Sequence, residues 1–87
     1  MNEDKALVPG DRVRVSKDSN WACGATGTVS DLPGYHPSFK AGQMNHTWTR
    51  DGRQFFWIKF DEAQESEGDT EGPFEEGAVD CKYLEKA

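Results

Sequence analysis

The seven residues 54–60, QFFWIKF, constrain the fold more than any other part of the sequence. Side chains of a β-strand alternate between the two faces of a sheet. The two faces would be Phe56, Ile58 and Phe60 on one side and Phe55, Trp57 and Lys59 on the other. Because large apolar residues occupy both faces, we expect either a central strand or a strand with one aromatic face left open for a partner.

Glycine and proline recur along the chain and favour short strands and turns over helices. There are nine glycines and four prolines in 87 residues, and no long amphipathic helical pattern. Val13 and Val15 alternate with polar residues at the period of two that marks a half-buried strand. We interpret residues 26–32 and 74–79 as further strands, and residues 80–82 as one helical turn before a last short strand. The predicted fold is all-β.

Residues 32–53 form a long stretch without a sustained hydrophobic period. Loops of this length in compact domains are usually functional or disordered. The aromatic residues of this stretch are Tyr35, Phe39 and Trp48. They argue against plain disorder, because disordered segments are poor in aromatic residues. Asp51-Gly52 predicts a hairpin turn, with residues 45–50 forming a strand that pairs with the segment after the turn.

Charge is distributed unevenly along this chain, whose net charge is −6. Residues 61–80 hold nine acidic residues and no lysine or arginine, whereas residues 33–60 hold four basic residues and one acidic residue. The low hydrophobicity of residues 61–73 predicts a mobile acidic loop. In the simpler interpretation this loop is only a solvated surface segment. In the functional interpretation its negative charge attracts a basic partner. We expect a flexible tail over residues 1–7 and one domain over residues 8–87.

No apolar run approaches the roughly 18 residues that a membrane span requires. The acidic N-terminus also lacks the apolar core of a secretory signal, so we expect a cytoplasmic protein without membrane insertion. Cys23 and Cys81 are then expected to be free thiols, with a disulfide or a shared metal site as alternatives. Together with His36 and His46 they show no zinc-binding spacing, and nothing places a base beside a cysteine nucleophile. We therefore expect no metal, no other cofactor and no enzyme activity.

The stretch CGATGTV sets Gly24 and Gly27 three residues apart, as in some phosphate-binding loops. A phosphate-binding loop needs a helix after the glycines, so that amides at the helix N-terminus point at the anion. Here β-branched residues and a proline follow instead. We expect Gly24 to supply a positive φ at the end of a loop, and Gly27 to allow a bulge or a close approach in a tightly curled strand.

Four blocks of the sequence, PGDRVRV, GATGTV, FFWIKFDE and VDCKYLEKA, together resemble SH3-like barrels. That grouping includes the KOW-type modules of ribosomal and transcription proteins, small barrels that are accessory subunits in electron transport, and the barrel of the nitrile hydratase β subunit. The resemblance implies a single barrel of about five short strands. Residues 32–53 would be a long inserted loop, residues 61–73 an acidic loop, and a short helical turn would lie near the C-terminus. Such a fold implies no single function.

The function that we expect is that of a non-catalytic protein-interaction or accessory-subunit module. Exposed aromatic residues beside arginine are typical of the centre of a protein interface. Residues 33–57 supply this combination, with aromatic anchors and arginines that fix the register. The predicted partner-binding residues are Tyr35, Phe39, Trp48, Arg50, Arg53 and Trp57. In the alternative interpretation, the aromatic residues of the long loop pack that loop onto the barrel.

A nucleic acid is the alternative partner, which the KOW resemblance implies. Lys40, Arg50 and Arg53, with the neighbouring aromatic residues, would form a groove in which bases stack. The net charge of −6 opposes this function, because affinity for nucleic acids comes largely from neutralising phosphates. The sequence leaves the oligomeric state open.

Overall fold

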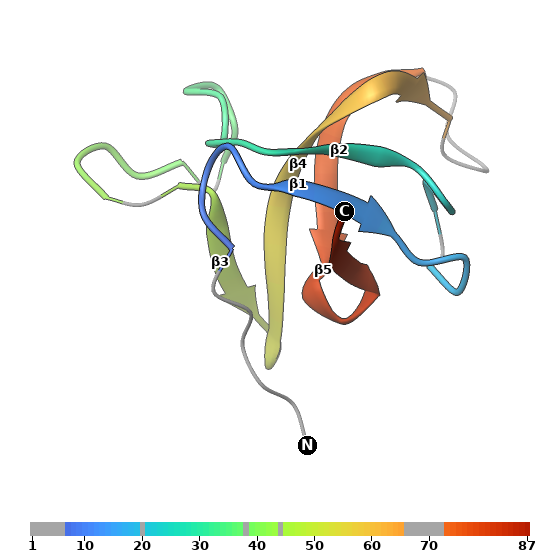
Figure 1. The fold of residues 1–87 in the computed structure, drawn as a ribbon. Helices are drawn as coiled ribbons and strands as arrows, with labels where there is room; N and C mark the ends of the chain where they lie inside the picture. The colour runs from blue at the N-terminus through green and yellow to red at the C-terminus, as the bar shows by residue number, and fades with distance from the viewer. Residues whose placement is uncertain (1–6, 20, 38, 44, 66–72) are drawn as a thin grey trace.

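The computed structural model describes residues 7–19, 21–37, 39–43, 45–65 and 73–87, and their strands form one curled antiparallel sheet (Figure 1). The elements are β1 (Arg12–Val15), β2 (Thr26–Val29), β3 (Thr47–Arg50), β4 (Arg53–Gln64), β5 (Phe74–Asp80), the 3₁₀ turn η1 (Cys81–Tyr83) and β6 (Leu84–Lys86). The sheet curls into a half-barrel. The predicted all-β fold with a helical turn near the C-terminus is confirmed, and the described residues form six strands in place of about five.

The sheet is organised around β4, which is 12 residues long. Residues 53–56 of β4 pair with β3, and residues 58–60 pair with β2. Because β5 pairs with residues 55–59, β2 and β3 must share the opposite edge of β4. The remaining order, β2-β1-β6, leaves the short strands β3 and β6 at the two ends of the path. The two-sided apolar sequence of β4 therefore belongs to a central strand, as expected.

One face of β4 forms the floor of the hydrophobic core. Phe56 and Ile58 are fully buried, and Phe60 is nearly so. Val13 and Val15 of β1 pack into the same core, as their alternation with polar residues predicts. Strands β2, β5 and β6 contribute Val29, Val79 and Leu84, respectively.

Two glycines allow the chain to close tightly over β4. A Cβ atom at Gly27 would lie 2.6 Å from the carbonyl oxygen of Lys59. The absence of a side chain thus permits the close approach predicted for this position. At Gly77, a Cβ atom would overlap the indole ring of Trp21, which crosses over this glycine and donates from Nε1 to the carbonyl of Ala78 (3.0 Å). Gly24 has a φ of 77°, which confirms the predicted positive φ.

Several of the expected segment boundaries differ from the structure, and the strand expected over residues 26–32 ends at Val29. Leu7, assigned to the flexible tail, is buried because it packs into the core. The acidic loop begins later than residue 61, since β4 continues through Gln64. The stretch 32–53 is not all loop: the strand expected over residues 45–50 is present as β3 and pairs with β4, which starts at the end of the stretch. Residues 1–6 of the expected tail and 66–72 of the expected acidic loop lie outside the described residues.

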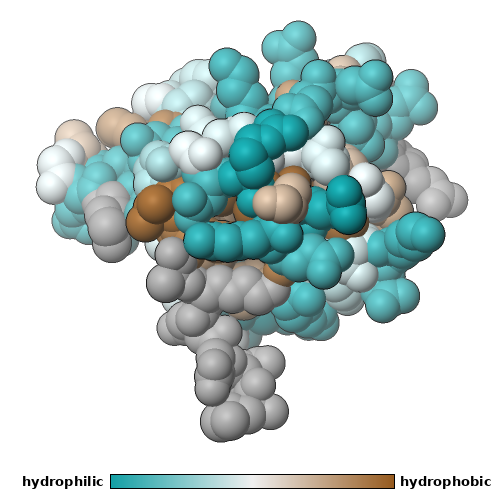
Figure 2. Space-filling model, viewed as in Figure 1, coloured by the Kyte–Doolittle hydropathy of each residue, from teal (hydrophilic) through white to brown (hydrophobic). Residues whose placement is uncertain are grey.

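The surface is hydrophilic over most of the face seen in Figure 2, where apolar atoms form only small patches. Within the described ranges, no helix has the length and apolar character that crossing a membrane requires.

Candidate interaction surface

The side of β3, β4 and β5 that faces away from the core, termed the outer face, gathers four of the predicted site residues. Cross-strand partners in a sheet share a face. Trp48 of β3 is the partner of Phe55 in β4, and Arg50 is the partner of Arg53. Phe55, Arg53 and Trp57 alternate with the core residues of β4 and therefore lie on its other side. The predicted residues on the outer face are Trp48, Arg50, Arg53 and Trp57.

Four rings pack together on this face and form what we call the outer cluster: His36, Trp48, Phe55 and Trp57. Trp48 stacks on Phe55 with ring centroids 6.0 Å apart, and lies 6.5 Å from Trp57. His36, from the long loop, lies 5.1 Å from Trp57 in an edge-on arrangement and 6.0 Å from Trp48. As a result, Trp57 is only 8% exposed although it points away from the core. Of the aromatic residues expected to pack the loop onto the sheet, Trp48 makes such a contact, with the loop residue His36.

Asn45 holds the long loop in a defined shape although the loop has no regular structure. Its side-chain Oδ1 accepts the backbone N–H of Lys40 (2.8 Å), and its Nδ2 donates to the carbonyls of Lys40 (2.9 Å) and Gln43 (3.0 Å). Its carbonyl accepts the N–H of Leu32 (2.9 Å), which joins the two ends of the loop. The next carbonyl, that of His46, accepts the N–H of Trp57 (3.0 Å), so the loop is tied directly to β4.

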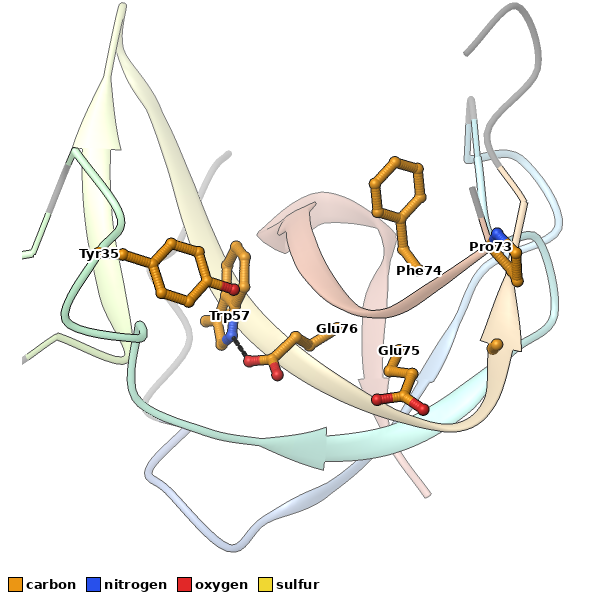
Figure 3. Close-up of a pocket in the computed structure, with 7 residues that line it drawn as sticks. Tyr35, Trp57, Pro73, Phe74, Glu75 and Glu76 are labelled. Carbon is orange, nitrogen blue, oxygen red and sulfur yellow. Dashed lines mark hydrogen bonds between the residues drawn. The ribbon is translucent and has the colours of Figure 1, made fainter. Parts of the chain in front are cut away.

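The two other predicted site residues, Tyr35 and Phe39, are more exposed than the outer cluster. Tyr35 is 84% exposed and Phe39 is 36% exposed. Tyr35 lies beside Trp57, at the rim of a hollow that both residues line (Figure 3). None of the ring contacts among the described residues joins Phe39 to the outer cluster. The structure therefore brings five of the six predicted residues to one surface.

The end of the outer face near the β3–β4 turn is basic. Asp51 and Gly52 have φ values of 53° and 76°, the left-handed pair that a tight hairpin turn requires, which confirms the predicted turn. Arg50, Asp51, Arg53 and Phe55 line a hollow of about 450 Å³ beside this turn. We call it the basic hollow, because its two arginines outnumber its one carboxylate. Its two guanidinium groups come from directly opposed positions of the hairpin.

A second hollow, of about 520 Å³, lies toward β5 and has the opposite character. We call it the acidic hollow, and it is lined by Tyr35, Trp57, Ala63, Pro73, Phe74, Glu75 and Glu76. Trp57 donates from Nε1 to Oε1 of Glu76 at 2.6 Å, which fixes the indole edge against the carboxylate. Figure 3 shows Tyr35 and Trp57 on one side, Phe74 and Pro73 on the other, and Glu76 between them.

Sequence reasoning did not select Phe74 or Glu76 as site residues. Glu76 was counted only as one charge among nine in residues 61–80. Its position depends on the register of β5 against β4, in which Ala78 faces Trp57 and Glu76 faces Lys59. The alternation of residues along 74–79 is the only sequence signal that bears on it, and that signal does not reveal which strand β5 pairs with.

An exposed ion pair on β1, β2 and β4 lies where β4 continues past residue 60. Arg12 donates from Nη1 to Oδ1 of Asp61 (2.7 Å) and to the hydroxyl of Thr28 (3.0 Å), and from Nη2 to Oδ2 of Asp61. The Thr26 hydroxyl also donates to Asp61 (2.8 Å). The hydrogen bond from Arg12, and then that from Thr26, lowers the pKa of Asp61 to about 2. The first acidic residue of the expected loop is thus a strand residue that joins three strands.

The candidate metal ligands are spread over the molecule. His46 is buried with its ring 6.2 Å from that of Phe56, and His36 belongs to the outer cluster. Cys23 is exposed and donates from Sγ to the carbonyl of Ser19 (2.9 Å), whereas Cys81 packs partly against the core. In the part of the chain that the structure describes, no three His, Cys, Asp or Glu side chains form a group that could hold a metal ion.

Comparison with known proteins assigns no role to the outer face. No protein-family model, no curated protein and no solved structure matches this chain. The case for a role of the outer face therefore depends on the shape, charge and exposure of its own side chains.

Proposed function

We propose that this protein is a non-catalytic interaction module or accessory subunit, and that it binds a protein partner through the outer face. One observation carries the proposal: Trp48, Arg50, Arg53 and Trp57 share a face that the core does not use. Tyr35 stands beside them with 84% of its surface exposed. Aromatic residues and arginine are the side chains most enriched at the centres of protein interfaces.

The anchoring of the long loop also supports this function. Asn45 and the backbone bond between His46 and Trp57 hold the loop against β4 before any partner arrives. A surface that is already ordered loses less conformational entropy on binding than one that must fold. The outer cluster would therefore be ordered before binding and would support the more exposed Tyr35.

We further propose that the half-barrel is of the SH3-like kind. In support, the four sequence blocks that resemble such barrels correspond to β1, β2, β4 and the segment from the end of β5 to β6, all in one curled antiparallel sheet. The resemblance to accessory subunits of electron transport implies docking to a larger complex.

The test uses a photo-crosslinking aromatic amino acid in place of Tyr35, in living cells of the source organism. We expect a defined protein to be crosslinked from this position and not from Lys17, an exposed residue between β1 and β2. The double substitution Arg50→Gln, Arg53→Gln should reduce the yield. The matched pair Arg14→Gln, Lys17→Gln removes the same charge from another part of the surface and should leave the yield unchanged. The same proteins crosslinked equally from both positions would overturn the proposal.

A nucleic acid is a second candidate partner, favoured by the basic hollow, where Arg50, Arg53 and Phe55 lie together. It is tested by ¹⁵N–¹H NMR titration with short single-stranded RNA and DNA at low and moderate salt. Binding of nucleic acid should shift only signals of residues 33–57, and the shifts should fade as salt is added. They should vanish in the Arg50→Gln, Arg53→Gln variant or weaken in Lys40→Gln. This result would establish the nucleic acid as the partner and displace the protein partner. An unchanged spectrum would remove the nucleic acid as a candidate.

A further inference from the structure

The acidic hollow combines exposed aromatic surface with carboxylates, and we propose that it receives an arginine side chain of the partner protein. The inference deepens the proposed function and rests on it, since it names the chemistry by which the partner is held. The hollow has a volume of about 520 Å³, which is more than one arginine side chain fills and lies within the size range of small-ligand sites.

The aromatic walls of the acidic hollow suit a flat cation. Tyr35 presents most of its ring to solvent, and Phe74 is partly exposed on the other side of the hollow (Figure 3). Trp57 is held in place beneath them by His36 and by its bond to Glu76. Cations within about 6 Å of an aromatic ring are attracted by the negative face of the ring. A guanidinium group also stacks on such rings through its planar surface.

The carboxylates of the acidic hollow lack a cation of their own. Among the ion pairs of the described residues, which join Arg12 to Asp61 and Lys86 to Asp11, none includes Glu75 or Glu76. Lys59 is the cross-strand neighbour of Glu76, yet it forms no ion pair with it in this part of the structure. A carboxylate can accept about four hydrogen bonds, so the bond from Trp57 leaves capacity on Glu76 for further donors.

Arginine fits these groups better than lysine does. The guanidinium presents five N–H donors in a planar fork that matches a carboxylate, whereas the lysine ammonium is a compact and strongly hydrated charge. One guanidinium can therefore donate to Glu76 while its plane lies against Tyr35. A partner that also places a carboxylate at the basic hollow would be held in one orientation, because the two hollows of the outer face have opposite charge.

The test is an NMR titration of the ¹⁵N-labelled protein with blocked pentapeptides Gly-X-Gly-X-Gly, in which X is arginine, lysine or citrulline. Citrulline has the shape of arginine without its charge. We expect the arginine peptide to shift the indole N–H signal of Trp57 and the backbone signals of residues 35 and 74–76. The citrulline peptide should leave them unchanged, and the lysine peptide should bind several-fold more weakly.

Three variants make the outcome decisive. Glu76→Gln keeps an oxygen that can accept the Trp57 N–H. It should lower the affinity for the arginine peptide by about tenfold, the usual effect of losing a charge-assisted hydrogen bond. Tyr35→Ala removes the ring of a residue that is 84% exposed, so it tests the contribution of this ring to peptide binding without destabilising the fold. Glu85→Gln removes the same charge from β6 and should leave the affinity unchanged.

The inference is overturned if no arginine-dependent shift occurs at residues 35, 57 and 74–76, or if Glu85→Gln weakens binding as much as Glu76→Gln. It is also overturned if a trimethyl-lysine peptide binds more tightly than the arginine peptide, since the hollow would then select a different cation. A partner crosslinked through position 35 whose capture is insensitive to Glu76→Gln would overturn this inference alone and leave the proposed function standing.

Discussion

The two faces of β4 are both aromatic and apolar, yet they are covered in different ways. The inner face is covered by strands that come from across the chain, among them β1 and β6, and Phe56 and Ile58 are fully buried there. The outer face is covered by one loop, in which His36 meets Trp57 and Asn45 fixes the loop shape. Strand packing seals a surface, whereas a single loop leaves its margins open, and it is at those margins that Tyr35 and the two hollows lie.

The largest difference in stability between the two faces is expected from Phe56 and Phe55, adjacent residues of β4 with the same side chain on opposite faces. Phe56→Ala should lower the free energy of unfolding by about 3–5 kcal/mol, because it leaves a cavity in a sealed core. Phe55→Ala should cost about 1–2 kcal/mol, since it removes a half-buried ring and its stacking on Trp48. Urea denaturation of both variants measures the difference, and equal losses would show that the outer face is sealed as well.

Asn45→Ala tests whether the loop is what covers the outer face. The change removes three hydrogen bonds of a buried side chain and should cost about 1–3 kcal/mol. Hydrogen exchange should quicken across residues 32–46 and at the Trp57 amide, which bonds the His46 carbonyl. Amides of β1 and β6 should keep their protection. Uniform acceleration over all strands would mean that the two faces unfold as one unit.

The ion pair of Arg12 and Asp61 gives a smaller effect that depends on pH. The pKa of Asp61 is lowered to about 2, so its contribution to stability is fully present above the ordinary carboxylate pKa of about 3.9 and is lost as the pH falls toward about 2. The difference in unfolding free energy between the wild type and Asp61→Asn should therefore shrink across that window. The cost of Phe56→Ala should stay constant over the same range, and a parallel fall would mean that acid loosens the core itself.

The smallest effect on stability is expected from Arg50→Gln with Arg53→Gln. These exposed, like-charged side chains face each other across the hairpin, so their loss should change the unfolding free energy by no more than about 0.5 kcal/mol. Partner capture should nevertheless fall. A thermal melt beside the crosslinking assay separates the two effects, and a large drop in melting temperature would assign these arginines a structural role.

Local patterns in the sequence were sufficient to predict most of the sheet. The alternation around Val13 and Val15, the two-sided run of β4 and the turn at Asp51-Gly52 each depend on residues close together in the chain. The shared face of Trp48 and Trp57 also follows from a hairpin of fixed register. These features could be predicted because β-strand geometry alone determines them.

The remainder depends on contacts between distant residues. Asp61 lies within β4, which continues to Gln64 where it pairs with Phe74 of β5, and it binds Arg12 from 49 positions earlier in the chain. Trp57 is buried because His36 lies on it, and Glu76 joins the site through its register with β4. No local period encodes these pairings, and for that reason the acidic hollow was not predicted. The acidic composition of residues 61–73 predicts a solvated loop, although residues 61–64 belong to β4.

A half-barrel leaves strand edges unpaired, and each such edge invites another chain to add to the sheet. The strands at the ends of the path here are only four and three residues long. These strands carry charged residues: Arg50 on β3, and Glu85 and Lys86 on β6. Strand β5, which pairs with β4 outside this path, carries Glu75 and Glu76. Short, charged edges disfavour growth of the sheet by a second copy. Arg50 and Glu76, which would also select a partner, thus belong to the charges that disfavour such growth.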